Sequence, residues 1–249
     1  MKSFFVIALL MYVLLGVYLY IQQRSFIYFP IAFSSSDLNQ QVFVNEGIEI
    51  HVSVLNAGQD HAIMYFGGNA ENVDYNATNF LQWFPEYTVY LVKYRGYGGS
   101  GGKPTEKDLY SDALYIYDEL RREGYEHISV IGRSLGSGVA TYLATHREIQ
   151  KCILITPFDS IERIAQSQYP IYPINLLLKD KYDSYSRAKN ITAHTLVITA
   201  EDDAIIPLSH TERLVSAFTI DVMFEVVEDA DHNNISEFPR YQQVLSEFM

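Results

Sequence analysis

The stretch Gly132-Arg133-Ser134-Leu135-Gly136 decides the fold of this chain. The apolar residues Val130 and Ile131 precede it, and a helix-compatible segment follows from Ser137. A serine hydroxyl is a weak nucleophile at neutral pH, so a protein that uses one exposes it on a sharp strand-to-helix turn beside a base. The two flanking glycines allow the backbone to turn that tightly. A glycine-rich turn after a buried strand fits the same five residues, so the surrounding sequence must distinguish the two interpretations.

Apolar runs typical of strands alternate with helical patterns along most of the chain. The turn signal Asn45-Glu46-Gly47 lies between the first two runs and predicts an antiparallel pair. The later alternation predicts βαβ units in a mostly parallel sheet with helices on both faces, an α/β fold. The expected strands are residues 41–44, 48–55, 62–66, 88–92, 128–131, 152–155, 194–199 and 222–227, and the expected helices are residues 70–83, 105–122, 137–146, 207–218 and a last one from 236.

One irregular region interrupts this alternation, from Thr156 to Asn190. It contains Pro157, Pro170 and Pro173 and has room for two short helices but not for a large independent lid. We therefore expect one globular domain over residues 25–249, in which residues 156–190 form a small cap-like insertion.

Composition narrows the classes of partner and site. The 249 residues carry a net charge of -12, which argues against nucleic acid as a partner, because affinity for phosphates comes mainly from Lys and Arg. The single cysteine, Cys152, excludes an intrachain disulfide and a Cys-rich metal site. Its place in an apolar run predicts a buried residue rather than a reactive thiol.

The first 24 residues predict a membrane anchor. Phe4 to Ile21 carries no charge, and Lys2 and Arg24 flank it. Eighteen helical residues span about 27 Å, close to the roughly 30 Å hydrocarbon core. A cleavable secretory signal is the alternative, but residues 18–24 offer no small-x-small cleavage site. The amino terminus and Lys2 place two positive charges before the span, and only Arg24 follows it closely. This difference favours a globular domain outside the cytoplasm.

Ligands of a doubly wound sheet bind beyond the carboxyl ends of its strands, so residues at those ends are the candidates for a site. The sequence Phe66-Gly67-Gly68-Asn69-Ala70 follows one strand and precedes the expected helix 70–83. Free N–H groups at a helix start suit an oxyanion hole, although a plain glycine turn fits as well. Leu135, the residue after Ser134, would supply the second N–H group of such a hole.

The other two candidates follow later strands. Among the acidic residues after strand 194–199 we choose Asp203, four residues before Pro207, and keep Asp202 as the alternative. A solvated acidic loop would also fit this segment. His232 lies after the last strand and before the final helix, where a base is needed. The resulting order, Ser134, Asp203 and His232, is the order expected of α/β-hydrolases.

The chain resembles the α/β-hydrolase superfamily, and more narrowly the small membrane-anchored α/β-hydrolase-domain proteins, which include depalmitoylase-like members and bacterial relatives. The resemblance covers residue 25 to the C-terminus and rests on the segments 65–72, 94–104 and 132–140 and on the neighbourhoods of Asp203 and His232. It implies Ser134 as nucleophile, Asp203 as orienting acid, His232 as base, and the N–H groups of Asn69 and Leu135 as oxyanion donors. The chain departs from the family pattern at Gly67, Ala200 and Asp231, none of which is one of these catalytic groups.

These observations predict a membrane-anchored serine hydrolase that cleaves carboxylic esters or thioesters through an acyl-enzyme. No metal or organic cofactor is implied. The anchor and the small insertion favour substrates presented at a bilayer, such as acylated proteins or lipids. A peptidase or amidase with the same triad is one alternative, and an anchored binding protein without turnover is another.

Overall fold

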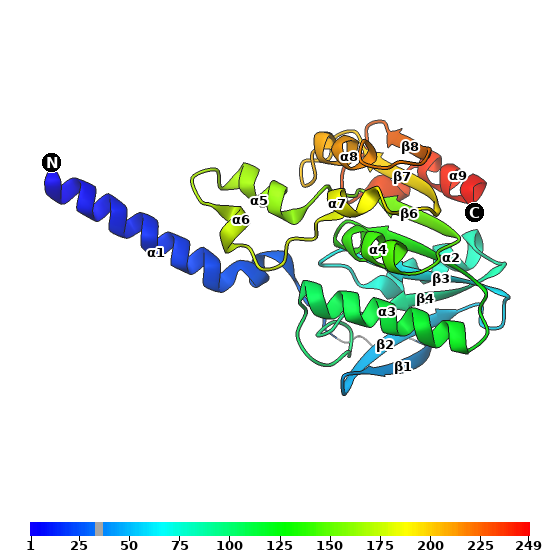
Figure 1. Ribbon diagram of the computed structural model, residues 1–249. Coiled ribbons are helices and arrows are strands. Elements are labelled where there is room, and N and C mark those ends of the chain that lie inside the picture. The colour runs from blue at the N-terminus through cyan, green and yellow to red at the C-terminus, as the bar shows by residue number, and fades with distance from the viewer. Residues whose placement is uncertain (33–36) are drawn as a thin grey trace.

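The computed structural model describes residues 1–32 and 37–249 and contains one sheet of eight strands (Figure 1). The spatial order of the strands is β1-β2-β4-β3-β5-β6-β7-β8. β2 pairs antiparallel with both β1 and β4, and all other neighbouring strands are parallel. The strands are β1 (Asn39–Asn45), β2 (Ile48–Leu55), β3 (His61–Phe66), β4 (Tyr87–Val92), β5 (His127–Arg133), β6 (Lys151–Ile155), β7 (His194–Ala200) and β8 (Val222–Val227).

Helices cover both faces of this sheet. Side chains of α3, α4 and α8 join the core on one face, and those of α2 and α9 join the core on the other. The helices are α1 (Lys2–Ile27), α2 (Ala77–Trp83), α3 (Glu106–Arg122), α4 (Leu135–His146), α5 (Ile161–Gln168), α6 (Ile174–Leu177), α7 (Ser184–Ala188), α8 (Leu208–Val215) and α9 (Pro239–Phe248), with 3-10 turns at Val73–Asn76 and Ile235–Glu237. The mostly parallel sheet, the antiparallel first pair and the two helical layers confirm the expected α/β fold.

Two sequence predictions about helices were wrong. The helix expected over 70–83 begins as a 3-10 turn at Val73, after an Asn72 cap that accepts from the N–H of Asp74, and becomes α-helical at Ala77. Residues 70–72 stay outside it because Glu71 and Asn72 use their side chains to hold the preceding loop and the turn. The region 156–190 contains three short helices, α5, α6 and α7, rather than two. The Ser-rich junction at residues 34–36 lies outside the described residues.

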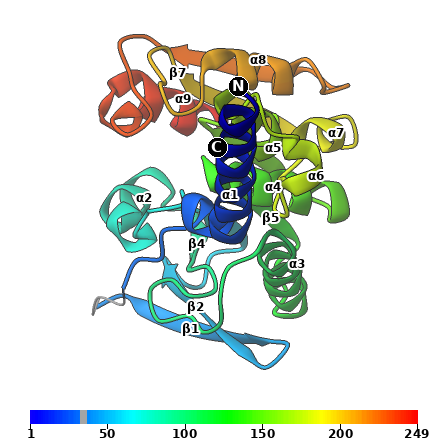
Figure 2. The same cartoon turned by 90° about the vertical axis from the view of Figure 1, so that its left-hand side faces the viewer.

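Helix α1 projects from the domain, and the cap helices α5 and α6 lie along its C-terminal half (Figures 1 and 2). It is long and apolar enough to cross a membrane, with a mean hydropathy of 2.5 over its most apolar 18-residue window and no residue of that window buried in protein. The helix continues to Ile27, through the predicted boundary between residues 24 and 25. Polar contacts fasten that end to the chain after α6, since Arg24 donates to both carboxylate oxygens of Asp180 at 2.8 and 3.2 Å.

The start of α4 packs against the sheet more closely than any side chain would allow. A Cβ atom on Gly136 would lie 1.9 Å from the carbonyl oxygen of Phe66 in β3. A Cβ atom on Gly132 would lie 2.4 Å from the carbonyl oxygen of Gly136. Both obstacles are backbone atoms, so neither can rotate away. The two glycines therefore set the distance between α4 and the strands that carry the site.

We expect Gly136→Ala to destabilise the fold by about 3 kcal/mol or more, because relieving the overlap requires a backbone shift. For a domain of this size the melting temperature should fall by roughly 6 °C or more. Gly101→Ala is the matched control, because its new methyl group would meet Ile48 at 3.4 Å, an ordinary contact. Equal melting temperatures for the two variants, measured by calorimetry, would contradict this account of α4.

Cys152 is fully buried in β6, which confirms the sequence prediction for this residue, and burial raises the pKa of its thiol to about 12. Little of the thiol is therefore ionised in the folded protein at pH 8. In the unfolded chain the thiol pKa is about 8.5, so a substantial fraction of the thiol is present as the reactive thiolate. Maleimide should modify the native protein slowly at pH 8 and rapidly after denaturation. Mass spectrometry measures the rate of modification. Fast labelling of Cys152 in the native protein would contradict its burial.

Candidate active site

Ser134 lies between β5 and α4 in a backbone conformation that L-residues rarely adopt, with φ 50° and ψ -115°. Such a conformation costs on the order of 1–3 kcal/mol. Two backbone hydrogen bonds hold it: the N–H of Ser134 donates to Ile155 at 2.8 Å, and its carbonyl accepts from the N–H of Ser137 at 2.9 Å. The strained turn lifts the hydroxyl above the carboxyl ends of the strands.

The structure brings Ser134, His232 and Asp203 into one hydrogen-bonded chain. The Nε2 atom of His232 lies 3.0 Å from the Ser134 Oγ, and its Nδ1 lies 2.7 Å from the Asp203 Oδ2. With Nδ1 protonated toward the carboxylate, Nε2 is free to accept the serine proton. This is the geometry of a nucleophile, a general base and an orienting acid.

Asp203, and not Asp202, is the carboxylate that reaches the histidine. Its second oxygen accepts the N–H groups of Ile205 and Ile206 at 2.9 and 2.7 Å, which fixes the loop before α8. The Asp203 side chain is buried beside His232, whereas Asp202 is exposed. These two backbone donors orient the Asp203 carboxylate toward the imidazole.

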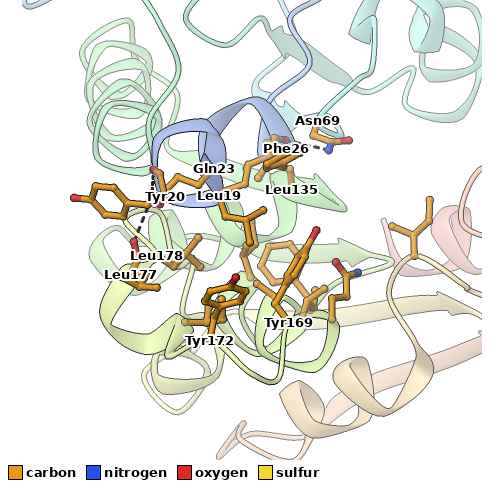
Figure 3. A pocket seen from close by; sticks show the side chains of 18 of the residues that line it. Leu19, Tyr20, Gln23, Phe26, Asn69, Leu135, Tyr169, Tyr172, Leu177 and Leu178 are labelled. Atoms are coloured by element: carbon orange, nitrogen blue, oxygen red, sulfur yellow. Dashed lines mark hydrogen bonds between the residues drawn. The ribbon is translucent and has the colours of Figure 1, made fainter. Parts of the chain in front are cut away.

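Asn69 and Leu135 both line the cavity beside Ser134 (Figure 3). Among the described residues, no hydrogen bond uses the backbone N–H of either one. Leu135 is the first residue of α4, where an N–H has no partner within the helix. Asn69 does not precede a helix directly, contrary to the sequence prediction, because the next helical turn begins only at Val73. Its orientation therefore depends on the loop and not on a helix dipole.

Glu71 holds that loop. One of its carboxylate oxygens accepts the N–H of Gly68 at 2.7 Å, and the other accepts the Tyr65 hydroxyl and the Asn76 amide, each at 2.6 Å. Burial and then the Glu71 charge hold the pKa of Tyr65 well above its usual value, so the phenol remains a donor. The tyrosines 94 and 97 complete the support by donating to the carbonyls of Gly67 and Asn69.

Arg133 connects this loop to the histidine. Its guanidinium lies 3.6 Å from Glu71 and donates to the carbonyls of His232 and Asn233 at 3.2 and 3.3 Å. Glu71 and Arg133 lie within the segments 65–72 and 132–140 that carry the family resemblance, but the sequence motifs predicted no role for either one. A signal was present, because a charged residue at the end of a buried strand requires a partner of opposite charge.

An apolar cavity of about 270 Å³ opens beside Ser134. Helix α1 forms one wall, and α5, α6 and the segment between them form another (Figure 3). The polar groups at its inner end are the Ser134 hydroxyl and the Asn69 amide. An apolar chain with a polar carbonyl at one end fits this arrangement.

Comparison with known proteins places this geometry in context. No family model matches the chain. An uncharacterized protein of Mycobacterium tuberculosis is 32% identical over 246 residues, covering 92% of this chain and 88% of that protein. The human alpha/beta hydrolase domain-containing protein 17B is 31% identical over 164 residues, covering 65% of this chain and 56% of that protein.

Solved structures share the fold at low sequence identity. The Pyrococcus furiosus esterase Pf2001 superposes with a TM-score of 0.71 at 16% identity, over 89% of this chain and 97% of that one. An esterase from Exiguobacterium antarcticum gives a TM-score of 0.66 at 19% identity, over 83% of this chain and 97% of that one.

We expect Glu71→Ala to slow the reaction of Ser134 with a fluorophosphonate by roughly ten- to a hundredfold, because the loop that carries Asn69 would shift by a fraction of an ångström to an ångström. The measurement is the second-order labelling rate, with circular dichroism to verify folding. Glu86→Ala, at an exposed position, is the matched control. A labelling rate equal to that of the control would show that Glu71 does not position the site.

Proposed function

The chain belongs to the α/β-hydrolase superfamily, and on that basis we propose that it is a serine hydrolase that cleaves carboxylic esters or thioesters through an acyl-enzyme. The observation that carries the proposal is the chain of hydrogen bonds from Ser134 through His232 to Asp203, at 3.0 and 2.7 Å. The apolar cavity beside the serine favours an acyl group over a polar substrate.

In the proposed first half-reaction, the Nε2 atom of His232 takes the proton of Ser134 as the serine oxygen attacks the carbonyl carbon. The N–H groups of Asn69 and Leu135 donate to the resulting oxyanion. His232 then passes its proton to the departing alcohol or thiol, which leaves an acyl group on Ser134. In the second half, His232 deprotonates a water molecule, whose attack releases the acid and returns the proton to Ser134.

Asp203 has a supporting role in both halves. The imidazole becomes positively charged when it takes the serine proton, and the buried carboxylate at 2.7 Å stabilises that charge. It also holds the Nδ1–H tautomer, without which Nε2 could not accept a proton. The contacts of Glu71 and Arg133 hold the loop that carries Asn69 at a fixed position relative to the loop that carries His232.

We also propose that α1 anchors the enzyme in a membrane. The exposed apolar surface of α1 supports this, as does its 26-residue length, because about 20 apolar residues are enough to cross a bilayer. The substrates would then be acyl esters or acylated molecules available at the membrane surface.

Replacing Ser134 or His232 by Ala should lower kcat for a p-nitrophenyl ester by on the order of 10⁶, and Asp203→Asn by roughly 10⁴. The Ser134→Ala variant should also lose fluorophosphonate labelling. Asp202→Asn is the matched control, since that neighbouring carboxylate is exposed and should matter little.

Two outcomes would redirect this proposal. A larger loss for Asp202→Asn than for Asp203→Asn would show that the acid is misassigned. A folded wild-type protein that neither turns over esters nor takes the probe would indicate a binding protein, and a matched ester and amide pair would separate an esterase from an amidase.

A further inference from the structure

Helix α1 contacts the cap along about three turns, more than an independent anchor needs. The rings of Tyr12 and Tyr172 stack at 4.6 Å, and each hydroxyl donates to a backbone carbonyl across the contact, Tyr12 to Ile171 and Tyr172 to Tyr12, both at 2.9 Å. Eleven residues later, Gln23 donates to Leu177 and accepts from the N–H of Lys179. The cap thus follows α1 for about 17 Å.

The cavity begins between these two contact points and extends beyond Gln23 to Ile27. Its α1 wall consists of side chains spaced three or four residues apart, which places them on one helical face. Those residues are Gly16, Leu19, Tyr20, Gln23, Phe26 and Ile27. The opposite wall is provided by Ile164, Ala165, Gln168 and Tyr172 of the cap. Ser134 is at the Ile27 end, so the cavity runs from the serine toward the apolar part of α1.

The charge pattern of the cap matches that of α1. Residues 164–178, IAQSQYPIYPINLLL, contain no charge, and Lys179 follows them directly. Lys179 lies over the Tyr20 ring at 4.3 Å, and Asp180 pairs with Arg24. Both uncharged segments therefore end at the same level of the molecule, where tyrosine and cationic side chains gather as they do at a membrane interface.

The cap tip, the middle of residues 164–178, exposes large apolar side chains. Ile171 and Leu176 are 67% and 79% exposed. Gln166 turns back on the tip, where it donates to Tyr172 and accepts from the N–H of Ile174. Pro170 and Pro173 carry no N–H group. Satisfying polar backbone groups internally is what a segment in a bilayer requires.

We propose that α1 and residues 164–178 enter the bilayer together, and that the cavity between them is a channel that takes one acyl chain of a membrane lipid ester from the bilayer to Ser134. The inference rests on the proposed hydrolase function. Ser134 lies near Ile27, about 9 Å along the helix beyond Ile21 and therefore at the outer edge of the headgroup region, which is roughly 5–8 Å deep on each side of the hydrocarbon core. A lipid ester carbonyl would have to rise by several ångströms to reach the serine, with its acyl chain held in the cavity.

The channel also implies a chain length. From Ile27 to Gly16 the α1 wall is about 16 Å long, and an extended carbon chain advances about 1.3 Å per bond. Acyl chains of about twelve carbons fill it. A Cβ on Gly16 would meet the Tyr172 ring at 2.9 Å, so the absence of a side chain at Gly16 lets that ring lie directly against α1 at the far end of the channel.

The first test is Gly16→Phe in protein reconstituted in phosphatidylcholine nanodiscs. The ratio of kcat/KM for a dodecanoyl ester to that for a butanoyl ester should fall by about ten- to a hundredfold, since the long chain loses its binding surface. Ala165→Phe narrows the channel from the opposite wall and should change the ratio in the same direction. Val17→Phe, on the exposed side of α1, is the matched control and should leave the ratio unchanged.

The second test measures the position of the tip. Leu176→Cys carrying a nitrobenzoxadiazole fluorophore should be quenched by spin-labelled lipid in the nanodisc and shielded from iodide. Gln242→Cys, exposed on α9, should show the opposite pattern. Equal iodide quenching at the two positions would overturn insertion of the cap.

These results are separable from the hydrolase proposal. If the butanoyl ester is cleaved and Ser134 is labelled, but the Gly16 and Ala165 variants keep the wild-type ratio, the channel is wrong and the hydrolase stands. If no ester is cleaved, the hydrolase itself fails. Faster cleavage of a water-soluble dodecanoyl peptide than of a dodecanoyl lipid in the same nanodisc would overturn the assignment to lipid.

Discussion

The close packing of α4 against the carboxyl ends of β3 and β5 is the constraint on which the rest of the site depends. Gly132 and Gly136 allow backbone to meet backbone there, at distances that would leave a methyl group 1.9 Å from the Phe66 carbonyl. The chain can then enter α4 only through the strained turn at Ser134, which hydrogen bonds to Ile155 and Ser137 hold in place. The close packing of α4 thus accounts for both the backbone strain at Ser134 and the exposure of its hydroxyl.

A second layer of polar contacts connects loops that are far apart in sequence. Glu71 orients the loop before α2, Arg133 spans from Glu71 to the histidine loop, and the N–H groups after Asp203 orient its carboxylate. None of these groups is proposed to react. They restrict the motion of Ser134, His232 and Asp203, which are proposed to take part in the reaction. Such contacts can hold side chains on loops as precisely as side chains on strands.

Helix α1 belongs to the site as well as to the proposed anchor. Because it lines the cavity and is stacked on the cap through Tyr12 and Tyr172, its position in a bilayer would set the position of the cavity mouth. If a flexible linker joined α1 to the domain, the depth of α1 in the bilayer would not fix the position of the cavity mouth. The proposal of a lipid ester channel rests on this rigid connection together with the uncharged residues 164–178.

The sequence alone determined the α/β fold and the order of the strands along the chain, and it predicted Ser134, Asp203 and His232 as site residues, because periodicity and residues at strand ends are local signals. It misplaced the start of the helix after Asn69, where the side chains of Glu71 and Asn72 compete with helical hydrogen bonds. Only the tertiary structure decided that Glu71 and Arg133 support the site, and that α1 faces the cap. Those contacts join residues up to 160 positions apart, and no pattern within a short stretch of chain encodes which distant surface a side chain will meet.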